Sequence, residues 1–258
     1  SWAPEMCIRD RYMRYNELTF QGRNAVLEAF RSGKTIDKLF ILDGCQDGPI
    51  KSIVREAKKT DAIINYVDKE RLDRLAGTGH HQGVVAIGAA YEYAEVDDIL
   101  ASAKEKGEDP FIFILDEIED PHNLGAIIRT ANLAGAHGVI IPKRRAVGLT
   151  ATVAKTSAGA INYTPVAKVT NISQTIEELK KQGLWFVCAD MGGETMYNLN
   201  LKGPIGLVIG NEGNGVSRLV KDKCDFIASI PMKGDIDSLN ASVAAGVLAY
   251  EIVRQRLN

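Results

Sequence analysis

From Phe111 onward, the chain alternates short, continuously apolar runs with helix-like stretches. The apolar runs cover residues 111–115, 138–142, 162–167, 184–189, 205–209 and 226–230, and helical patterns lie near 123–135, 150–159, 172–182, 215–221 and 239–256. Strands that are apolar along their whole length are buried on both faces, and helical crossovers join parallel strands. The pattern therefore predicts an α/β domain whose parallel sheet is covered by helices on both faces.

A shorter alternation precedes this domain. Helical patterns near residues 24–31, 50–59 and 69–75 separate apolar runs at 38–42, 62–67 and 83–90, which predicts a small α/β domain over residues 20–93. Residues 94–108 are acidic and contain one apolar helical turn, so we interpret them as a linker to a second domain over 109–258. Residues 1–19 are an N-terminal extension that begins SWAPEMCIRDRY; MCIRDR resembles translated sequencing-library adapter, so we give this start no part in the fold.

Composition and charge exclude several classes of protein. The net charge of −2 gives no global basic field, so a polyanionic partner must be held by local basic clusters. No apolar run approaches the ~20 residues that span a bilayer, and the N-terminus lacks the apolar core of a signal peptide, so we expect a cytoplasmic protein. The cysteines, Cys7, Cys45, Cys188 and Cys224, are isolated from one another, which argues against a zinc site or any other metal site and for a reducing compartment.

Two late strands each break into a loop of glycines and small polar residues before a helix. The first reads IGLVIGNEGNGVSRLV from Ile205, and the second reads FIASIPMKGDIDSLNAS from Phe226. Loops at the carboxyl ends of parallel strands are where open α/β sheets bind ligands, so the two loops predict one composite pocket. The glycine order G-x-x-G-x-G disfavours a dinucleotide-dependent oxidoreductase, and the loop lacks the G-K-[ST] of a P-loop.

The helix that follows the strand at 111–115 carries the first candidate site residues. Its apolar positions suggest burial nearly all round, and Arg129 is its only charge. Arg129 either forms a structural salt bridge with Asp116, Glu117, Glu119 or Asp120, or lies at the mouth of the pocket and grips a phosphate. Asn123 either caps this helix or holds Arg129 or a substrate.

Three polar residues of the two loops allow the same two interpretations. Glu212 either caps the helix near Val216 or faces a ligand. Ser238 and Asn240 stand at the start of the last helix, where capping is the default role. Their concurrence around one predicted pocket favours a role in the site.

Three segments with these residues resemble a known family. DPHNLGAIIRTANLAGAHG, GLVIGNEGNGVSRLV and SIPMKGDIDSLNASVAAGVLAYE, in this order and spacing, look like the three signature motifs of the SpoU/TrmH family of RNA ribose 2′-O-methyltransferases. The first domain, with GRNAVLEAF and HHQGVVA, resembles the substrate-binding domain that many of these enzymes carry. The two-domain layout is similar to the type that methylates a guanosine of bacterial 23S ribosomal RNA. Transfer RNA is the rival substrate, and a non-catalytic RNA-binding protein is a more distant alternative.

The resemblance implies a deep trefoil knot in the C-terminal domain, a homodimer, and S-adenosylmethionine as the methyl donor. Carried to matching positions, it implies that the cofactor is held by Gly210, Ile230, Met232 and Leu239, and that the catalytic set is Asn123, Arg129, Glu212, Ser238 and Asn240. Family assignments make Arg129 the base. An arginine is not expected to accept a proton, so a contact with the phosphate beside the target ribose is the physically easier role.

Candidate RNA contacts lie in both domains. The densest basic cluster of the second domain follows the strand at 138–142, and polar residues stand near the first helix and before the last strand of the first domain. Solvated loops would explain both sets equally simply. The candidate residues are Arg23, Asn24, His81, Gln82, Lys143, Arg144 and Arg145.

Overall fold

The computed structural model describes residues 19–60, 62–77 and 80–257, so Cys7 and residues 1–18 of the N-terminal extension lie outside the described residues. The chain forms two compact units: the first ends at Glu92 and includes the short segment Gly148–Ala151, and the second holds the remainder from Tyr93. Among the described residues, no helix is long and apolar enough to cross a membrane.

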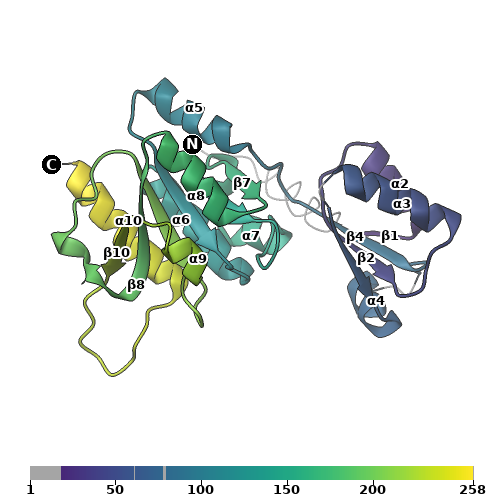
Figure 1. The fold of residues 1–258 in the computed structure, drawn as a ribbon. Coiled ribbons are helices and arrows are strands. Elements are labelled where there is room, and N and C mark those ends of the chain that lie inside the picture. The colour runs from purple at the N-terminus through teal and green to yellow at the C-terminus, as the bar shows by residue number, and fades with distance from the viewer. Residues whose placement is uncertain (1–18, 61, 78–79, 258) are drawn as a thin grey trace, which may run out of the picture. The chain divides into compact units, whose positions relative to one another are not determined.

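The described residues of the first unit form a four-stranded mixed sheet with three helices (Figure 1). Strands β2 and β3 are parallel, whereas β4 pairs antiparallel with both β1 and β2, giving the order β1-β4-β2-β3. The predicted elements are present, and β1 is an addition to them. In chain order they are β1 (Thr19–Gln21), α2 (Arg23–Arg31), β2 (Ile36–Leu42), α3 (Gly48–Lys59), β3 (Ile63–Val67), α4 (Lys69–Ala76) and β4 (Val84–Gly88).

The second unit is a six-stranded, wholly parallel sheet in the order β10-β8-β9-β5-β6-β7. The predicted parallel α/β fold is confirmed. Its elements are α5 (Val96–Lys106), β5 (Phe111–Asp116), α6 (Pro121–Leu133), β6 (Gly138–Pro142), α7 (Ala151–Thr156), η1 (Ala160–Asn162), β7 (Val166–Val169), α8 (Ile172–Lys181), β8 (Trp185–Thr195), η2 (Met196–Asn198), β9 (Ile205–Gly210), α9 (Arg218–Lys221), β10 (Phe226–Ser229) and α10 (Ala241–Arg256).

The segment predicted to be a linker is part of the second unit. Residues 96–106 form α5, and Ile99 is fully buried in a core cluster with side chains from β5, β6, β8 and α8. Gly138 permits this packing, because a Cβ there would lie 2.5 Å from Ile99 Cδ1. Asp97 and Asp98 lie in the first turn of α5 and Lys104 and Lys106 in its last turn, where their charges interact favourably with the helix dipole.

Several helices and strands of the second unit begin or end at other residues than predicted. Helix α7 ends at Thr156, and a short 3₁₀ turn precedes β7, which begins at Val166 instead of residue 162. Strand β8 runs on to Thr195, six residues past its apolar core, and α9 begins only at Arg218. These differences occur in segments of small and polar residues, where the sequence shows no clear hydrophobic periodicity.

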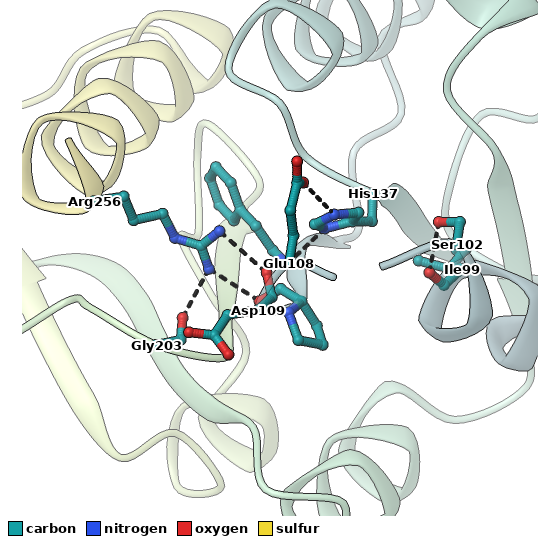
Figure 2. Close-up of polar contacts among 9 residues, drawn as sticks. Ile99, Ser102, Glu108, Asp109, His137, Gly203 and Arg256 are labelled. Carbon is teal, nitrogen blue, oxygen red and sulfur yellow. Dashed lines mark hydrogen bonds and ion pairs between the residues drawn. The ribbon is translucent and has the colours of Figure 1, made fainter. Parts of the chain in front are cut away.

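The amino-terminal ends of β5 and β9 are tied to the last helix by Arg256 (Figure 2). Its guanidinium donates to the carbonyl oxygens of Asp109 at 3.1 Å, Pro110 at 3.1 Å and Gly203 at 2.7 Å, and it lies 5.1 Å from the centroid of the Phe111 ring. Burial lowers the pKa of this guanidinium. A desolvated cation is therefore stabilised here mainly by main-chain dipoles.

His137 secures the same end of β5. Its Nδ1 accepts from the Phe111 N–H at 3.0 Å, and its Nε2 contacts a Glu108 carboxylate oxygen at 2.9 Å (Figure 2). Burial lowers the pKa of His137, in keeping with an Nδ1 that must stay unprotonated to accept the Phe111 bond.

Arg256→Ala is expected to lower the free energy of unfolding by about 3 kcal/mol, because it leaves three carbonyl oxygens without their charged donor. Chemical denaturation monitored by circular dichroism measures the change. The matched control is Arg218→Ala, since the Arg218 side chain is 93% exposed and faces Asp222 only at 3.9 Å. Equal free energies of unfolding in the two variants would contradict the stabilising role of Arg256.

Candidate functional site

A cavity of about 400 Å³ opens in the second unit, beside the middle of β8 and the carboxyl ends of β9 and β10. Both predicted loops contribute to it, so the composite pocket predicted from the sequence is present. Its lining is glycine main chain, apolar side chains, and a few uncharged polar and carboxylate side chains. The lining residues are Ala189, Asp190, Met191, Ile209, Gly210, Asn211, Glu212, Gly213, Asn214, Gly215, Ala228, Ile230, Met232, Asp237, Ser238, Leu239, Ala241 and Ala244.

The glycine loop after β9 closes back on itself. The Asn211 and Gly215 main chains exchange hydrogen bonds of 3.1 and 2.8 Å, and Asn211 Oδ1 accepts from the Gly213 N–H at 2.8 Å. A Cβ on Gly210 would lie 2.1 Å from the carbonyl carbon of Gly215 and 2.2 Å from the Val216 nitrogen. Only glycine therefore fits at this position, and the wall of the cavity is bare main chain.

Glu212, Asn123 and Asn240 form one hydrogen-bonded network at this edge of the sheet. Asn123 Nδ2 donates to Glu212 Oε1 at 2.9 Å, and Asn240 Nδ2 donates both to the same oxygen and, at 3.1 Å, to Asn123 Oδ1. The three residues come from α6, the glycine loop and the start of α10. The network therefore joins the three segments that the sequence singled out.

The hydrogen bonds show which of these residues cap a helix. Asp120, not Asn123, caps α6, by accepting from the His122 N–H, and Asn123 is a buried residue inside the helix. The Glu212 carboxylate accepts hydrogen bonds from the two asparagine amides, and it caps no helix among the described residues. Asn240 does both, because its Oδ1 also accepts from the Ser242 and Val243 N–H groups. Ser238 lines the cavity and does not cap α10.

Sequence reasoning missed the wall contributed by β8. Ala189, Asp190 and Met191 line the cavity, although the predicted strand ended at residue 189. The Asp190 carboxylate accepts from Lys221 Nζ and, at 3.0 Å, from the Gly192 N–H. Lys221 lowers the pKa of Asp190. The pair of glycines at 192–193 was the available signal, because it marks an irregular strand.

Known proteins match this arrangement over nearly the whole chain. The model of the SpoU rRNA Methylase family matches residues 110–250, and the model described as RNA 2′-O ribose methyltransferase substrate binding matches residues 21–94. The chain belongs to the SpoU methylase family. It is thus a member of a family of RNA methyltransferases, with a substrate-binding module ahead of the methylase domain.

Relatives agree with this assignment, and a solved structure agrees with the fold. Bacillus subtilis (strain 168) YacO, named for the TrmH family of tRNA/rRNA methyltransferases, is 53% identical over 91% of this chain and 94% of its own length. A Staphylococcus aureus (strain MRSA252) protein named for the same family is 50% identical over 91% of this chain and 95% of its own. The SpoU methyltransferase AviRb from Streptomyces viridochromogenes, solved in complex with AdoMet, shares the fold with a TM-score of 0.59 and 24% identity, covering 96% of this chain and 98% of that one.

In this SpoU methylase chain, Arg129 lies apart from the network. It is exposed on α6, it does not line the cavity, and it has no ion-pair or hydrogen-bond partner within the described ranges. The predicted salt bridge to a nearby acid is therefore absent. The expectation that α6 is buried nearly all round was wrong, because only the stripe with Leu124, Ile127 and Ile128 faces the core and Leu133 is 65% exposed.

The first unit brings its candidate RNA contacts together at one end of α2. The main-chain N–H of Arg23 donates to Gln82 Oε1 at 3.1 Å, and Arg23 Nε donates to the Gln82 carbonyl at 3.1 Å. Arg23 also pairs with Asp47 at 2.5 Å, and Asn24 is exposed beside it. Residues distant in the sequence thus form one polar surface.

His81 has a different place from the one predicted. It is 5% exposed, its Nε2 lies 2.7 Å from an Asp73 carboxylate oxygen, and its Nδ1 accepts from the Gly83 N–H at 3.0 Å. Because both ring nitrogens are engaged inside the unit, His81 fixes the turn that presents Gln82 and offers no ring nitrogen to a ligand.

The basic cluster of residues 143–145 follows β6. Arg144 and Arg145 are exposed, and Arg145 forms an ion pair of 3.1 Å with Glu117. Glu117 also accepts a hydrogen bond at 3.1 Å from Asn211 Nδ2 through its carbonyl oxygen. The basic cluster, the loop after β5 and the glycine loop therefore adjoin one another at the carboxyl edge of the sheet. No group of three or more potential metal ligands occurs in the part of the chain that the structure describes.

Proposed function

We propose that this protein transfers a methyl group from S-adenosylmethionine to a ribose 2′-hydroxyl of RNA, with a guanosine of 23S ribosomal RNA as the target. The observation that carries the proposal is the cavity walled by the glycine loop, with Glu212 held by Asn123 and Asn240 at its side. The substrate-binding model matched by the first unit supports RNA as the partner. Such an RNA target puts the reaction in the cytoplasm.

The cavity suits S-adenosylmethionine better than a phosphorylated nucleotide. Its volume falls in the usual range of small-molecule sites. Gly210, Ile230, Met232 and Leu239 give main-chain and apolar surfaces for a purine and a ribose. Asp190, Glu212 and Asp237 are acidic, and no basic side chain is among the described residues that line the cavity. Carboxylates favour a sulfonium and repel phosphates, which argues against a dinucleotide-dependent oxidoreductase.

The bound cofactor would supply an activated methyl group, and the protein must orient the ribose oxygen and ease the loss of its proton. We assign orientation to Glu212, whose position is fixed by the two asparagine amides. Ser238 lies on the exposed loop beside the cavity, where its hydroxyl can bond the substrate. Arg129 presents an exposed guanidinium suited to a phosphate rather than to proton abstraction.

The remaining expectations extend this proposal. Arg23, Asn24 and Gln82 would contact RNA from the first unit, with His81 positioning Gln82. Lys143, Arg144 and Arg145 would bind its backbone beside the cavity. From the family resemblance, we also propose a deep trefoil knot in the methylase domain and a homodimer that uses the last helix. Exposed Val243 and Tyr250 on α10 are compatible with such a dimer.

Neutralising the basic cluster is expected to weaken RNA binding and flatten its salt dependence. In a variant with Lys143, Arg144 and Arg145 changed to Gln, the plot of log K against log salt should become less steep. Its slope should decrease in magnitude by about 0.7–0.9 for each phosphate contact removed. Fluorescence anisotropy with labelled RNA at several salt concentrations measures the slope. Gln at exposed Lys104, Lys106 and Lys181 is the matched control, and an unchanged slope in the first variant would rule the cluster out.

The proposed function is tested by incubating the full chain with ribosomal RNA or transfer RNA and labelled S-adenosylmethionine, then mapping the 2′-O-methyl group. Transfer to a guanosine of 23S ribosomal RNA is the expected result. Transfer only to tRNA would replace the substrate but keep the chemistry. Absence of transfer to either RNA would favour a non-catalytic RNA-binding protein, and binding of NADH instead of S-adenosylmethionine would favour an oxidoreductase.

A further inference from the structure

We propose that Asp190 is a cofactor-binding residue whose carboxylate accepts hydrogen bonds from the ribose hydroxyls of the adenosyl group. The proposal rests on the proposed function, because it deepens the description of the same cavity. Neither the three motifs nor the family resemblance includes this residue. Three observations support the proposal: an irregularity of β8, the fixed position of the Asp190 carboxylate and the order of the strands.

The irregularity is a bulge in β8 that faces the cavity. Val187 and Cys188 pair with Phe226 and Ile227, whereas the next residues of β10, Ala228 and Ser229, pair with Glu194 and Thr195. Residues 189–193 therefore leave the ladder with β10, and those at 189–191 line the cavity. Gly193 allows the chain to return, because a Cβ there would lie 2.3 Å from the Ile227 carbonyl oxygen.

Two contacts fix the Asp190 carboxylate within this bulge. Oδ1 accepts from the Gly192 N–H at 3.0 Å, and Oδ2 accepts from Lys221 Nζ. The Lys221 ammonium lowers the pKa of Asp190, so the side chain is an ionised acceptor at neutral pH. Each carboxylate oxygen accommodates more than one donor. With its side chain 26% exposed, Asp190 keeps accepting capacity on the cavity side.

Asp190 lies beside the glycine loop, in a position where acidic residues of other α/β proteins bind a ribose. Strand β8 neighbours β9, with Cys188 opposite Val208, so Asp190 and Gly210 each lie two residues beyond that pair. In α/β nucleotide sites, an acidic residue beside a glycine loop accepts from a ribose hydroxyl. The dinucleotide fingerprint is absent from this sequence, but the structure recreates its juxtaposition of glycine loop and acid from a different part of the chain.

The strand order also separates Asp190 from the network that we assign to the reaction. Asn123 follows β5, which lies on the other side of β9 from β8. Asp190 and Asn123 therefore approach the glycine loop from opposite sides. A ribose held at Asp190 leaves the Glu212 side of the cavity for the methyl group and the RNA.

Binding of adenosine and of 2′,3′-dideoxyadenosine tests the proposal by isothermal titration calorimetry on the full chain. In the wild type, we expect dideoxyadenosine to bind about tenfold more weakly than adenosine. In Asp190→Ala, adenosine should bind about tenfold more weakly than in the wild type, and the two ligands should bind equally. Asp222→Ala is the matched control: it removes a nearby exposed carboxylate that does not line the cavity, and should retain the wild-type preference.

Asp190→Asn guards against a folding defect. It retains the side-chain shape and the acceptor for Gly192, and thermal unfolding checks its integrity; it should lose part of the preference for adenosine. Equal weakening of both ligands, or a full preference for adenosine in either Asp190 variant, would overturn the proposal. A wild type that binds neither adenosine nor S-adenosylmethionine would overturn the proposed function. Cofactor binding with normal methyl transfer but no ribose preference would overturn only the role of Asp190.

Discussion

Gly210→Ala is expected to weaken binding of S-adenosylmethionine by about 100-fold. The added Cβ would lie 2.1 Å from the Gly215 carbonyl carbon and 2.2 Å from the Val216 nitrogen. Both atoms belong to the main chain, so no side-chain rotation relieves the overlap, and the loop must move as a unit. Because the loop is a wall of the cavity, its displacement changes the surface on which the cofactor would lie.

The control for this variant is Gly234→Ala. Gly234 also lies in an exposed loop near the cavity, but a Cβ there meets nothing within 4 Å. Isothermal titration calorimetry with S-adenosylmethionine should give the wild-type affinity for Gly234→Ala. Thermal unfolding of both variants separates a local change in the loop from global loss of structure. Wild-type affinity in Gly210→Ala would contradict the assignment of this loop as the cofactor wall.

The sheet of the methylase domain was predictable because its strands are apolar on both faces. Strands β5, β6 and β9 lie where continuous apolar runs predicted them. Helix α5 was not predictable in this way. Its sequence is mostly polar, and its place in the fold depends on tertiary contacts, among them Ile99 over the bare main chain of Gly138. Local pattern carries no information about such a partner.

The candidate site shows the same contrast between residues that local sequence pattern indicates and residues that only the tertiary structure brings to the cavity. Gly210, Ile230 and Leu239, which the family resemblance assigned to the cofactor, line the cavity, and the two loops that hold them were recognisable because they follow apolar strands. Asp190 was missed because its place in the cavity wall arises from a bulge in β8 and from its contact with Lys221, a residue of another element. The exposure of Arg129 was misjudged for a related reason: small apolar residues make the outer side of α6 look buried, although nothing covers Leu133 or Arg129 among the described residues.

Glu212→Ala is expected to lower kcat for RNA methylation by about 100-fold, because the loss removes the group that holds both asparagines in register. Asn123 is buried, and its amide would lose its carboxylate partner. Glu212→Gln retains a side-chain oxygen that can accept from both amides, so it should recover part of the rate. This ordering separates positioning from charge, since an effect of charge alone would make the two variants equal.

Single-turnover methylation at saturating RNA and cofactor measures the step that Glu212 is assigned to. Glu119→Ala is the matched control, because Glu119 is an exposed acid on the neighbouring loop after β5 and does not line the cavity; it should keep the wild-type rate. The network joins α6, the glycine loop and α10, so its removal should change the rate more than the affinity for S-adenosylmethionine. A Glu212→Ala enzyme with an unchanged single-turnover rate and weakened cofactor binding would instead make Glu212 a cofactor ligand only.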